Sequence, residues 1–366
     1  MLSKEVKIIS AIVFLCTVSL SVKAAVKLNQ LQVIGSHNSY KTGLDEQIVN
    51  KLNELQAGFA DKISYAHPTL SKQLDLGLRQ LEIDVLADSQ GGRYANPLGQ
   101  AWTQNPLYRN VQNQQLAKPG FKVLHIPDID VSSHCVLFVE CLTQLKRWSN
   151  QHPHHLPIYI LFNVKESRWK NSTGVQPELF SVSHYQTLSK QIAKVLGHDK
   201  LLTPADIKQP NQGLAESIQR QGWPELESVR GKFVFVFDAN ERQLQRFEPI
   251  ANPNMFAAWP IEHPNAAFLL FNNPLQQHEL ITQAVAQGFI VRTRADEFNA
   301  KQSPRNRAKR AINSGAQIIS SDFYLGAKQT PLNAPFVSFK LVNKQDDKQP
   351  INPFVRCVNV VTDCPL

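Results

Sequence analysis

The 366-residue chain lacks most features that mark a specialised class of protein, and each absence excludes something. It has five cysteines but no C-x-x-C pair, which argues against a zinc ribbon or a dithiol redox centre. It has no Gly-x-Ser-x-Gly elbow of a serine hydrolase, and no basic stripe with interleaved aromatics that would bind nucleic acid. Hydrophobic residues make up 42% and charged residues 19%, so the chain is not a disordered tail and can bury a large core.

Long apolar runs are also scarce, and the one that stands out, residues 8–22, lies at the N-terminus. Two lysines precede it and small residues follow it, which is typical of a secretory signal peptide. It is shorter than the ~20 residues that span a bilayer. We therefore predict that residues 1–24 are removed and that the protein is exported to the periplasm or the medium without a transmembrane anchor. An N-terminal core helix is the alternative.

Export would place the cysteines in an oxidising compartment, where disulfides form. Cys16 lies in the predicted signal peptide, so four cysteines remain. The simplest pairing joins neighbours in the sequence, Cys135 with Cys141 and Cys357 with Cys364. Cys16 as a lipoprotein acceptor is disfavoured, because no small residue precedes it.

Short β-branched and aromatic runs alternate with helical patterns along the chain. The predicted strands are 31–34, 81–85, 123–124 with its flanks, 158–164, 233–237, 268–271, 289–291 and 317–320. The predicted helices include 70–78, 137–150, 184–196, 274–286 and 304–314. Eight alternating units favour an α/β fold, the (β/α)8 TIM-type barrel.

This barrel is predicted to be one catalytic domain, residues 25–326. Residues 87–120 are rich in Gln, Asn, Gly and Pro without a period, and we interpret them as a long loop over one barrel mouth. Residues 327–366 are expected to form a tail that packs on the barrel and is held by its own disulfide.

Polar residues follow the first four predicted strands, at the end where barrel enzymes place their catalytic groups. These residues are His37 and Asn38, Glu82 and Asp84, His125, and Lys165 with Glu166. Such a concentration at four successive strand ends predicts an active site at that mouth.

The residue types suggest a metal site. Glu82 and Asp84 are two residues apart, so they share one face of a strand. With Glu166 and the amide oxygen of Asn38 they offer four oxygen ligands, which suits Ca2+, or less well Mg2+, far better than zinc. The two histidines would then be free for phosphoryl or proton chemistry. The alternative is a buried ion-pair network with core histidines.

Six segments together resemble the calcium-dependent phosphoinositide-specific phospholipase C family of secreted bacterial enzymes, within the superfamily of barrel phosphodiesterases. They are His37-Asn38-Ser39-Tyr40, Leu81-Glu82-Ile83-Asp84-Val85, Val123-Leu124-His125-Ile126-Pro127-Asp128-Ile129-Asp130, Val164-Lys165-Glu166, Val291-Arg292-Thr293-Arg294-Ala295-Asp296, and the run from Ser314 to Tyr324. The similarity covers about residues 31–326, and the segments are specific in combination but weak singly.

The resemblance implies that Asn38, Glu82, Asp84 and Glu166 hold Ca2+, which lowers the pKa of the inositol 2-hydroxyl. Either Glu82 or Glu166 would take the proton of that hydroxyl. The inositol oxygen would then attack the neighbouring phosphorus, which needs no nucleophile from the enzyme.

The two histidines have separate roles in the implied mechanism. His37 would hydrogen-bond the phosphoryl oxygens, and His125 would protonate the departing diacylglycerol. The first product would be a cyclic inositol phosphate.

Four other residues are candidates to bind the head group: Lys165, Arg292, Arg294 and Tyr324. Lys165 would project away from Glu166 unless the strand bends, and a solvated lysine is the alternative. The two arginines share a face, and Arg294 is favoured as a phosphate contact, with a salt bridge to a nearby Asp as the alternative. Tyr324 would stack on the inositol ring or be an ordinary packed tyrosine.

The leading hypothesis is a monomeric, exported phospholipase C that acts on phosphoinositide lipids at a membrane surface and binds no nucleic acid. A glycerophosphodiester phosphodiesterase and a catalytically silent lipid-binding barrel are the alternatives. Removing Lys4, Lys7, Lys23 and Glu5 with the signal lowers the net charge by 2, from +9 to +7. The remaining positive charge fits attraction to an anionic lipid surface.

Overall fold

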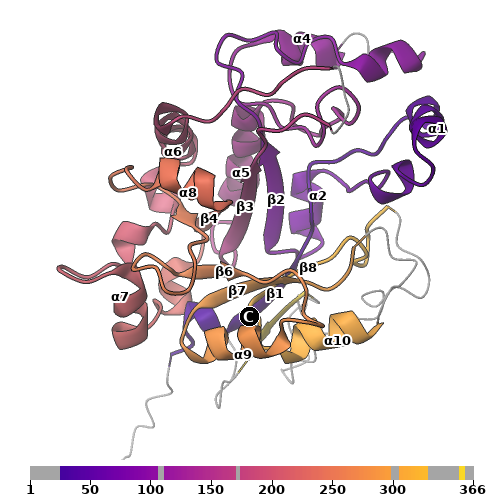
Figure 1. Cartoon of the computed structure of the whole chain (residues 1–366). Helices are drawn as coiled ribbons and strands as arrows, with labels where there is room; N and C mark the ends of the chain where they lie inside the picture. Colours follow the sequence, from indigo (N-terminus) through magenta and orange to yellow (C-terminus); the bar gives the residue numbers. More distant parts are fainter. Residues whose placement is uncertain (1–24, 106–110, 170–173, 298–304, 329–353, 359–366) are drawn as a thin grey trace, which may run out of the picture.

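A computed structural model describes residues 25–105, 111–169, 174–297, 305–328 and 354–358. The predicted signal peptide lies outside these residues. Parallel strands form a nearly closed TIM-type barrel with helices around it (Figure 1). The strand order is β5-β4-β3-β2-β1-β8-β7-β6, and within the described part of the chain no pairing joins β5 to β6. The strands are β1 (Leu31–Gly35), β2 (Gln80–Val85), β3 (Ile158–Val164), β4 (Phe233–Asp238), β5 (Phe256–Ala257), β6 (Phe268–Leu270), β7 (Ile290–Arg294) and β8 (Ile318–Ser320).

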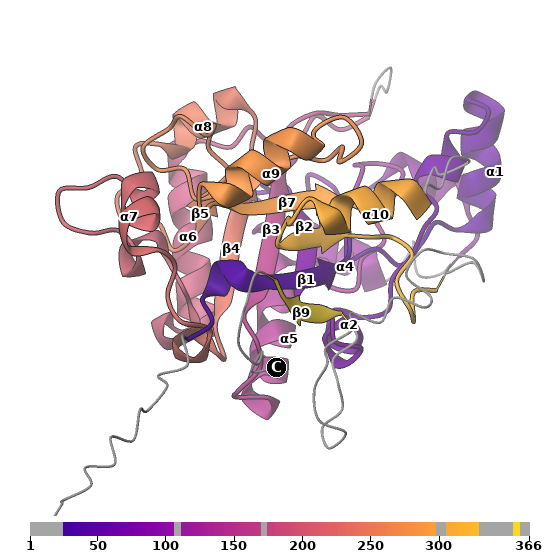
Figure 2. The same ribbon diagram turned by 90° about the horizontal axis from the view of Figure 1, so that it is seen from below.

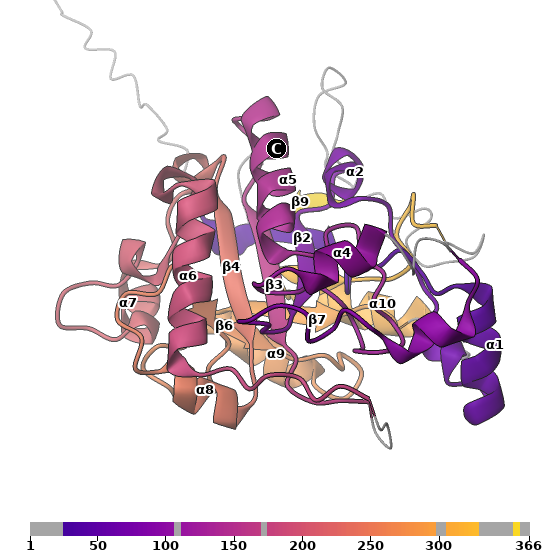
Figure 3. The ribbon, with the colours of Figure 1, turned by 90° about the horizontal axis from the view of Figure 1, so that it is seen from above.

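Helices cover the outside of the barrel, and α5 and α6 pack side by side (Figure 3). The α-helices are α1 (Glu46–Leu55), α2 (Leu70–Asp75), α4 (Val111–Ala117), α5 (Phe138–Gln151), α6 (Val182–Leu196), α7 (Leu214–Gln221), α8 (Glu241–Phe247), α9 (His278–Ala286) and α10 (Arg305–Asn313). Short 3-10 turns are η1 (Leu28–Gln30), η2 (Ala60–Lys62), η3 (Leu98–Trp102), η4 (His198–Lys200), η5 (Pro204–Asp206) and η6 (Leu226–Val229). In the part of the chain that the structure describes, no helix is long and apolar enough to cross a membrane.

Local chemistry sets several of these helix ends. The side chain of Ser181 accepts a hydrogen bond from the backbone of His184 at the start of α6, and Asn240 does the same for Gln243 in α8. Gly197 ends α6 with φ 96°, a conformation that costs a residue with a Cβ more than it costs glycine.

The strands alternate between two apolar layers. On β3, Ile160 and Phe162 belong to the core between the barrel and its helices. Tyr159 and Leu161 belong to the core inside the barrel. Because the side-chain period of a strand is two, this alternation fixes which face each later residue of β3 occupies.

Seven of the eight predicted strands are present, but the strand predicted at 123–124 is wrong. That segment makes only isolated bridges, such as Lys122 with Leu86, and β2 pairs directly with β3 along its whole length. The missing barrel strand is β5, which has two residues and is too short to give a sequence pattern. The segment predicted as a long loop, 87–120, belongs to the connection between β2 and α5, but it contains η3 and the helix α4, which the prediction did not include.

Part of the C-terminal tail packs against the barrel. The additional strand β9 (Val355–Cys357) pairs antiparallel with β1, so that Leu31 lies opposite Cys357 (Figure 2). β1 meets β2 only at Gly35 and Gln80, which leaves an edge of β1 open to this pairing. Cys364 lies outside the described residues, so its pairing with Cys357 stays a prediction, as does the division of the chain into domains.

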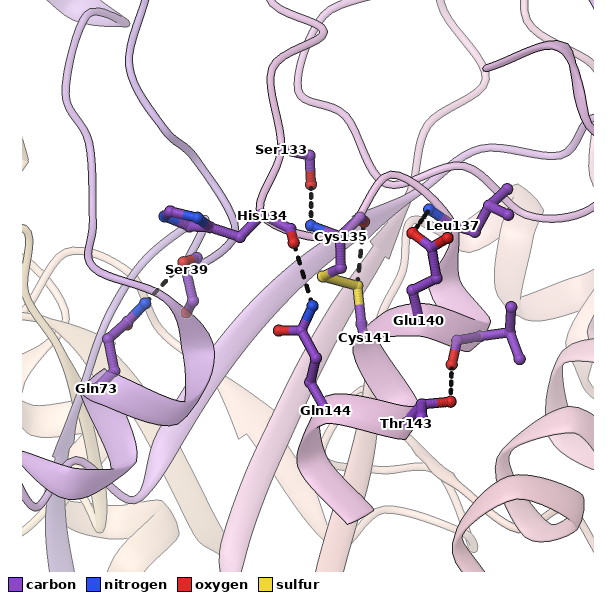
Figure 4. Close-up of a disulfide and its surroundings, with 11 residues drawn as sticks. Ser39, Gln73, Ser133, His134, Cys135, Leu137, Glu140, Cys141, Thr143 and Gln144 are labelled. Atoms are coloured by element: carbon purple, nitrogen blue, oxygen red, sulfur yellow. Dashed lines mark hydrogen bonds between the residues drawn. A yellow bond between two sulfur atoms is a disulfide. The ribbon is translucent and has the colours of Figure 1, made fainter. Parts of the chain in front are cut away.

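The other predicted disulfide is confirmed, because Cys135 is bonded to Cys141. It ties the end of the β2–α5 connection to the first turn of α5 (Figure 4). Beside it, Gln144 of α5 donates a hydrogen bond to the backbone oxygen of His134. The connection that contains His125 is therefore anchored at its C-terminal end.

Candidate active site

The register of the parallel strands brings polar side chains together where the strands end. Glu82 and Asp84 of β2 point into the barrel, because the residues between and beside them belong to the outer core. Asp84 is aligned with Asn163 of β3, and Asn163 with Asp238 of β4. Arg292 of β7 reaches across to Glu82. A charged and amide layer therefore replaces the apolar interior at this mouth.

Glu82 lies at the centre of this layer. Its Oε2 pairs with Arg292 Nη2 at 2.5 Å, and its Oε1 accepts a hydrogen bond from Asn163 Nδ2 at 3.3 Å. His37 Nε2 lies 3.8 Å from the same Oε1. Glu82 and Arg292 are both buried, so the loss of either one would leave an uncompensated charge.

Asp84 is held on one side only. Its Oδ2 accepts a hydrogen bond from the Tyr40 hydroxyl at 2.9 Å and lies 3.2 Å from Lys165 Nζ. Its Oδ1 is buried and has no hydrogen-bond partner among the described residues. Asp84 raises the pKa of Lys165 despite the opposing effect of burial. Lys165 thus lies inside the barrel beside Asp84.

Asn38, like Asp84, has a buried side-chain oxygen without a hydrogen-bond partner among the described residues. Its backbone adopts φ 47°, a left-handed conformation that Asn tolerates better than most residues. Its Nδ2 donates to the Tyr65 hydroxyl at 2.7 Å, which orients the side chain. Its Oδ1 is left buried without a hydrogen-bond partner in the part of the chain that the structure describes.

Glu166 does not join the other predicted ligands. Both of its carboxylate oxygens contact Arg246 Nη2 of α8, at 2.6 and 2.7 Å, and the backbone of Phe180 donates to it. Glu166 continues the outward row of Phe162 and Val164, so the alternation of β3 directs it away from the mouth. The prediction that Lys165 and Glu166 lie on opposite faces of the strand is correct. However, Lys165 is the residue that points into the barrel, and not Glu166.

His37 is surrounded by donors and acceptors. Arg294 Nη2 lies 3.0 Å from its Nδ1, the Tyr65 hydroxyl 3.2 Å and Asp322 Oδ1 3.5 Å. Burial and the positive charge of Arg294 hold the pKa of His37 well below its usual value. His37 is therefore neutral near pH 7, as a hydrogen-bonding group for an anion can be.

His125 is fixed from one edge. Its Nδ1 lies 2.7 Å from Asp130 Oδ2, and Lys41 Nζ contacts the same oxygen. Burial and Lys41 lower the pKa of His125, against the opposing effect of Asp130. No hydrogen bond from the described residues reaches Nε2, which is the nitrogen left to face a substrate.

The predicted head-group residues divide into two kinds. Arg292 is buried, and its guanidinium binds Ser320 and Asn272 as well as Glu82, so it has an internal partner on every side. Tyr324 is fully buried and stacks on His67, which contradicts stacking on a substrate ring. Arg294 remains partly exposed, 3.9 Å from Asp322.

The donor set at the mouth fits a hard cation in part. Among the described residues, no group of three or more His, Cys, Asp or Glu is arranged to hold a metal. However, Asn38, Glu82 and Asp84 bring oxygen atoms to one mouth, and two of those atoms are buried with no hydrogen bond. Buried polar atoms of this kind usually have a partner, and oxygen-rich ligation is what Ca2+ prefers.

The sequence analysis assigned no role to Asn163, and it did not identify Lys41, Tyr65 or Asp238. Asp238 is the last residue of β4, so a search for polar residues at strand ends would have found it. Burial raises its pKa, and nearby Glu82 and Asp84 add to the effect. Asn163 could have been found by alternation, two residues before Lys165. Tyr65 lies in a loop, and no pattern in the sequence marks it.

Comparison with known proteins identifies a family and supports the fold. The family model for phosphoinositide phospholipase C, Ca2+-dependent, matches residues 26–347. A calcium-dependent phosphoinositol-specific phospholipase C from the Gram-negative bacterium Pseudomonas sp, in complex with myo-inositol, is 17% identical, with a TM-score of 0.55 over 91% of this chain and 96% of its own. A Ca2+-dependent phosphatidylinositol-specific phospholipase C from Streptomyces antibioticus is 15% identical, with a TM-score of 0.51 over 81% of this chain and 95% of its own.

At these identities the two structures support the fold alone, and no curated protein matches the chain. The family model extends through the barrel from β1 to β8 and includes every residue of the mouth described above. The chain therefore belongs to the Ca2+-dependent phosphoinositide phospholipase C family.

Proposed function

We propose that the protein is an exported, calcium-dependent phospholipase C that cleaves phosphatidylinositol to diacylglycerol and a cyclic inositol phosphate. The observation that carries this proposal is the convergence of Asn38, Glu82 and Asp84 with His37 and His125 at one barrel mouth. The Cys135–Cys141 disulfide supports an oxidising compartment, as expected after export.

Asn38, Glu82 and Asp84 would hold the calcium ion, and Glu166 has no part in this site. When bound, the ion would lower the pKa of the inositol 2-hydroxyl and offset negative charge on a phosphoryl oxygen. Glu82 would take the hydroxyl proton through Oε1, which lies 3.8 Å from His37 Nε2, whereas its Oε2 is paired with Arg292. Lys165 and Arg294 are partly exposed cations at this mouth, and they would bind the phosphate.

The histidines complete the reaction on either side of the phosphorus. His37, neutral and near Arg294, hydrogen-bonds a phosphoryl oxygen as its negative charge grows. His125 donates its Nε2 proton to the glyceryl oxygen as the bond from phosphorus to that oxygen breaks. The inositol oxygen forms the new bond to phosphorus, which closes the cyclic product.

Exposed apolar side chains support a membrane surface as the location of the substrate. The exposed large hydrophobic residues of the described chain are Leu55, Leu98, Val139, Leu179, Leu275, Leu280 and Leu325. Each lies in a segment that follows the end of a barrel strand, or in the first turn of the next helix. In a barrel these segments surround the catalytic mouth, so apolar groups border the entrance.

The test is turnover of two substrates at saturating calcium and after chelation. We expect cleavage of phosphatidylinositol that chelation abolishes, with little release of glycerol phosphate from glycerophosphoinositol. Preferred hydrolysis of glycerophosphoinositol would favour a glycerophosphodiesterase, and turnover unaffected by chelation would remove the metal from the mechanism. His125→Ala should lower kcat by ~100-fold or more, as loss of a general acid does.

A further inference from the structure

Lys41 and Asp130 form a buried ion pair behind His125. Neither side chain is exposed, and both come from loops and not from barrel strands. Lys41 Nζ contacts Asp130 Oδ2, the same oxygen that lies 2.7 Å from His125 Nδ1. Lys41 Nζ is also 3.3 Å from that Nδ1. One carboxylate oxygen therefore serves a histidine and a lysine together.

The loop itself holds Asp130 in place. The backbone N–H groups of His125 and Ile126 both donate to the Asp130 carbonyl, and the Asp130 N–H donates back to Ile126. Asp128 between them adopts φ 74°, which lets the chain turn tightly. The spacing of His125 and Asp130 is thus set by the turn.

Lys41 changes the effect of the Asp130 carboxylate on the acidity of His125. An aspartate alone beside an imidazole stabilises the protonated ring and makes it a weaker acid. Lys41 offsets the negative charge of Asp130. The aspartate therefore orients the ring through Nδ1 but stabilises the protonated ring less than an unpaired aspartate would. Lys41 is a donor only, and at 3.3 Å its charge repels a protonated ring.

We propose that Lys41 is a positioning residue for His125, which neutralises Asp130 so that the oriented imidazolium gives up its Nε2 proton readily to the leaving glyceryl oxygen. This inference rests on the proposed role of His125 as the acid. It concerns a residue that touches neither substrate nor metal, because Lys41 is sealed beneath Asp130 and the ring of Tyr65.

Lys41 and Asp130 carry opposite charges beside His125, so their removal should shift the pKa of His125 in opposite directions. Besides Lys41 and Asp130, Asp84 of β2 and His37 after β1 act on it electrostatically, and the Tyr65 ring lies 6.5 Å from its ring. Removing the positive charge of Lys41 raises the pKa of His125, whereas removing the negative charge of Asp130 lowers it. A nearby charge shifts a pKa by roughly 1 to 3 units.

The test follows kcat against pH for Lys41→Met, Asp130→Asn, the double variant and Lys41→Arg, with phosphatidylinositol and saturating calcium. An acid must be protonated, so activity falls as the pH rises through its pKa. This alkaline limb should move to higher pH in Lys41→Met by about one unit and to lower pH in Asp130→Asn, with the double variant between them. Lys41→Arg should keep the wild-type limb, and KM should change little in all four.

A substrate with a nitrophenol leaving group provides the second measurement, because such a group needs no proton. With it, the deficits of Lys41→Met and His125→Ala should both shrink by at least ~10-fold. If His125→Ala shows this shrinkage and Lys41→Met does not, the Lys41 proposal fails while the proposed function stands. Limbs that move in the same direction, or do not move, would also overturn it. If Lys41→Met does not fold, Asp130→Asn and the double variant still decide the direction in which the alkaline limb moves. The double variant has no unpaired buried charge, so its limb can be compared with that of Asp130→Asn.

Discussion

At the scale of single residues, two carboxylates that look equivalent in the sequence differ in the structure. Glu82 faces the mouth and Glu166 faces α8. We expect Glu82→Gln to lower calcium-dependent turnover by ~100-fold or more, as loss of a metal-site group does. Glu166→Gln should leave the calcium dependence of kcat within a few-fold of wild type and lower the free energy of unfolding by ~1 kcal/mol or less, because its pair with Arg246 is only partly buried.

A calcium titration of activity and a thermal melt of both variants would check this pair. An equal loss of calcium response in the two variants would restore Glu166 to the site. The melt separates this result from a general loss of structure.

Asp296 gives a pH prediction at the same scale. Burial, with a further contribution from Asp322, raises its pKa from 3.8 to about 7. A carboxyl with a raised folded-state pKa contributes stability below the unfolded value, and this contribution is lost as the pH rises through the folded value. The free energy of unfolding of Asp296→Asn, which cannot ionise, should therefore increase relative to wild type between pH 4 and pH 7.

Urea unfolding at several pH values measures this difference. Asp45→Asn is the matched control, because hydrogen bonds from Thr103 and Asn105 outweigh desolvation and lower the pKa of Asp45. The free energy of unfolding of Asp45→Asn should therefore decrease relative to wild type as the pH rises through about 4. A pH-independent difference for Asp296→Asn would show that this carboxyl is not perturbed.

At the scale of elements, the Cys135–Cys141 disulfide joins the long β2–α5 connection to α5. It closes a loop with a sequence separation of 6, for which the chain-entropy model gives ~2 kcal/mol. The double variant Cys135→Ser, Cys141→Ser should lose about this much free energy of unfolding, measured in urea.

The same experiment tests the second predicted disulfide. If Cys357 and Cys364 are bonded, a reductant should destabilise the double variant further. If the reductant has no further effect on it, the pairing of Cys357 with Cys364 is wrong.

The sequence pattern predicted most of the barrel strands but not all of them. The alternation of strands and helices predicted the barrel and seven of its strands, because buried strands are rich in β-branched and aromatic residues. The strand predicted at 123–124 failed because a short apolar stretch looks the same whether it enters the sheet or only bridges beside it. β5 was missed because two residues carry no period.

At the scale of the whole molecule, the proposed membrane surface leads to a prediction about exposed leucines in segments that follow barrel strands. Leu55 and Leu179 are 55% and 63% exposed. Changing both to Ser should weaken binding to phosphatidylinositol vesicles by roughly 10- to 100-fold, since burial of half a Leu side chain contributes ~1 kcal/mol. Turnover of a soluble inositol phosphodiester should be unchanged.

Vesicle cosedimentation and the soluble assay measure the two effects separately. Unaltered vesicle binding would mean that this part of the mouth does not contact lipid. Loss of the soluble activity would mean that the leucines support the fold of the mouth and not its docking.

The sequence by itself determined the barrel class, the family, the local cysteine pair and most of the residues that the mouth contains, because these depend on periodicity, spacing and residue type. It determined that Lys165 and Glu166 lie on opposite faces, but only the register of β3 against β2, with Asn163 beside Asp84, decided which one points inward. Tertiary packing alone brought Lys41 to Asp130 and enclosed Tyr324 against His67. Such contacts join segments far apart in the chain, and a local pattern carries no information about which distant side chain will fill the space beside it.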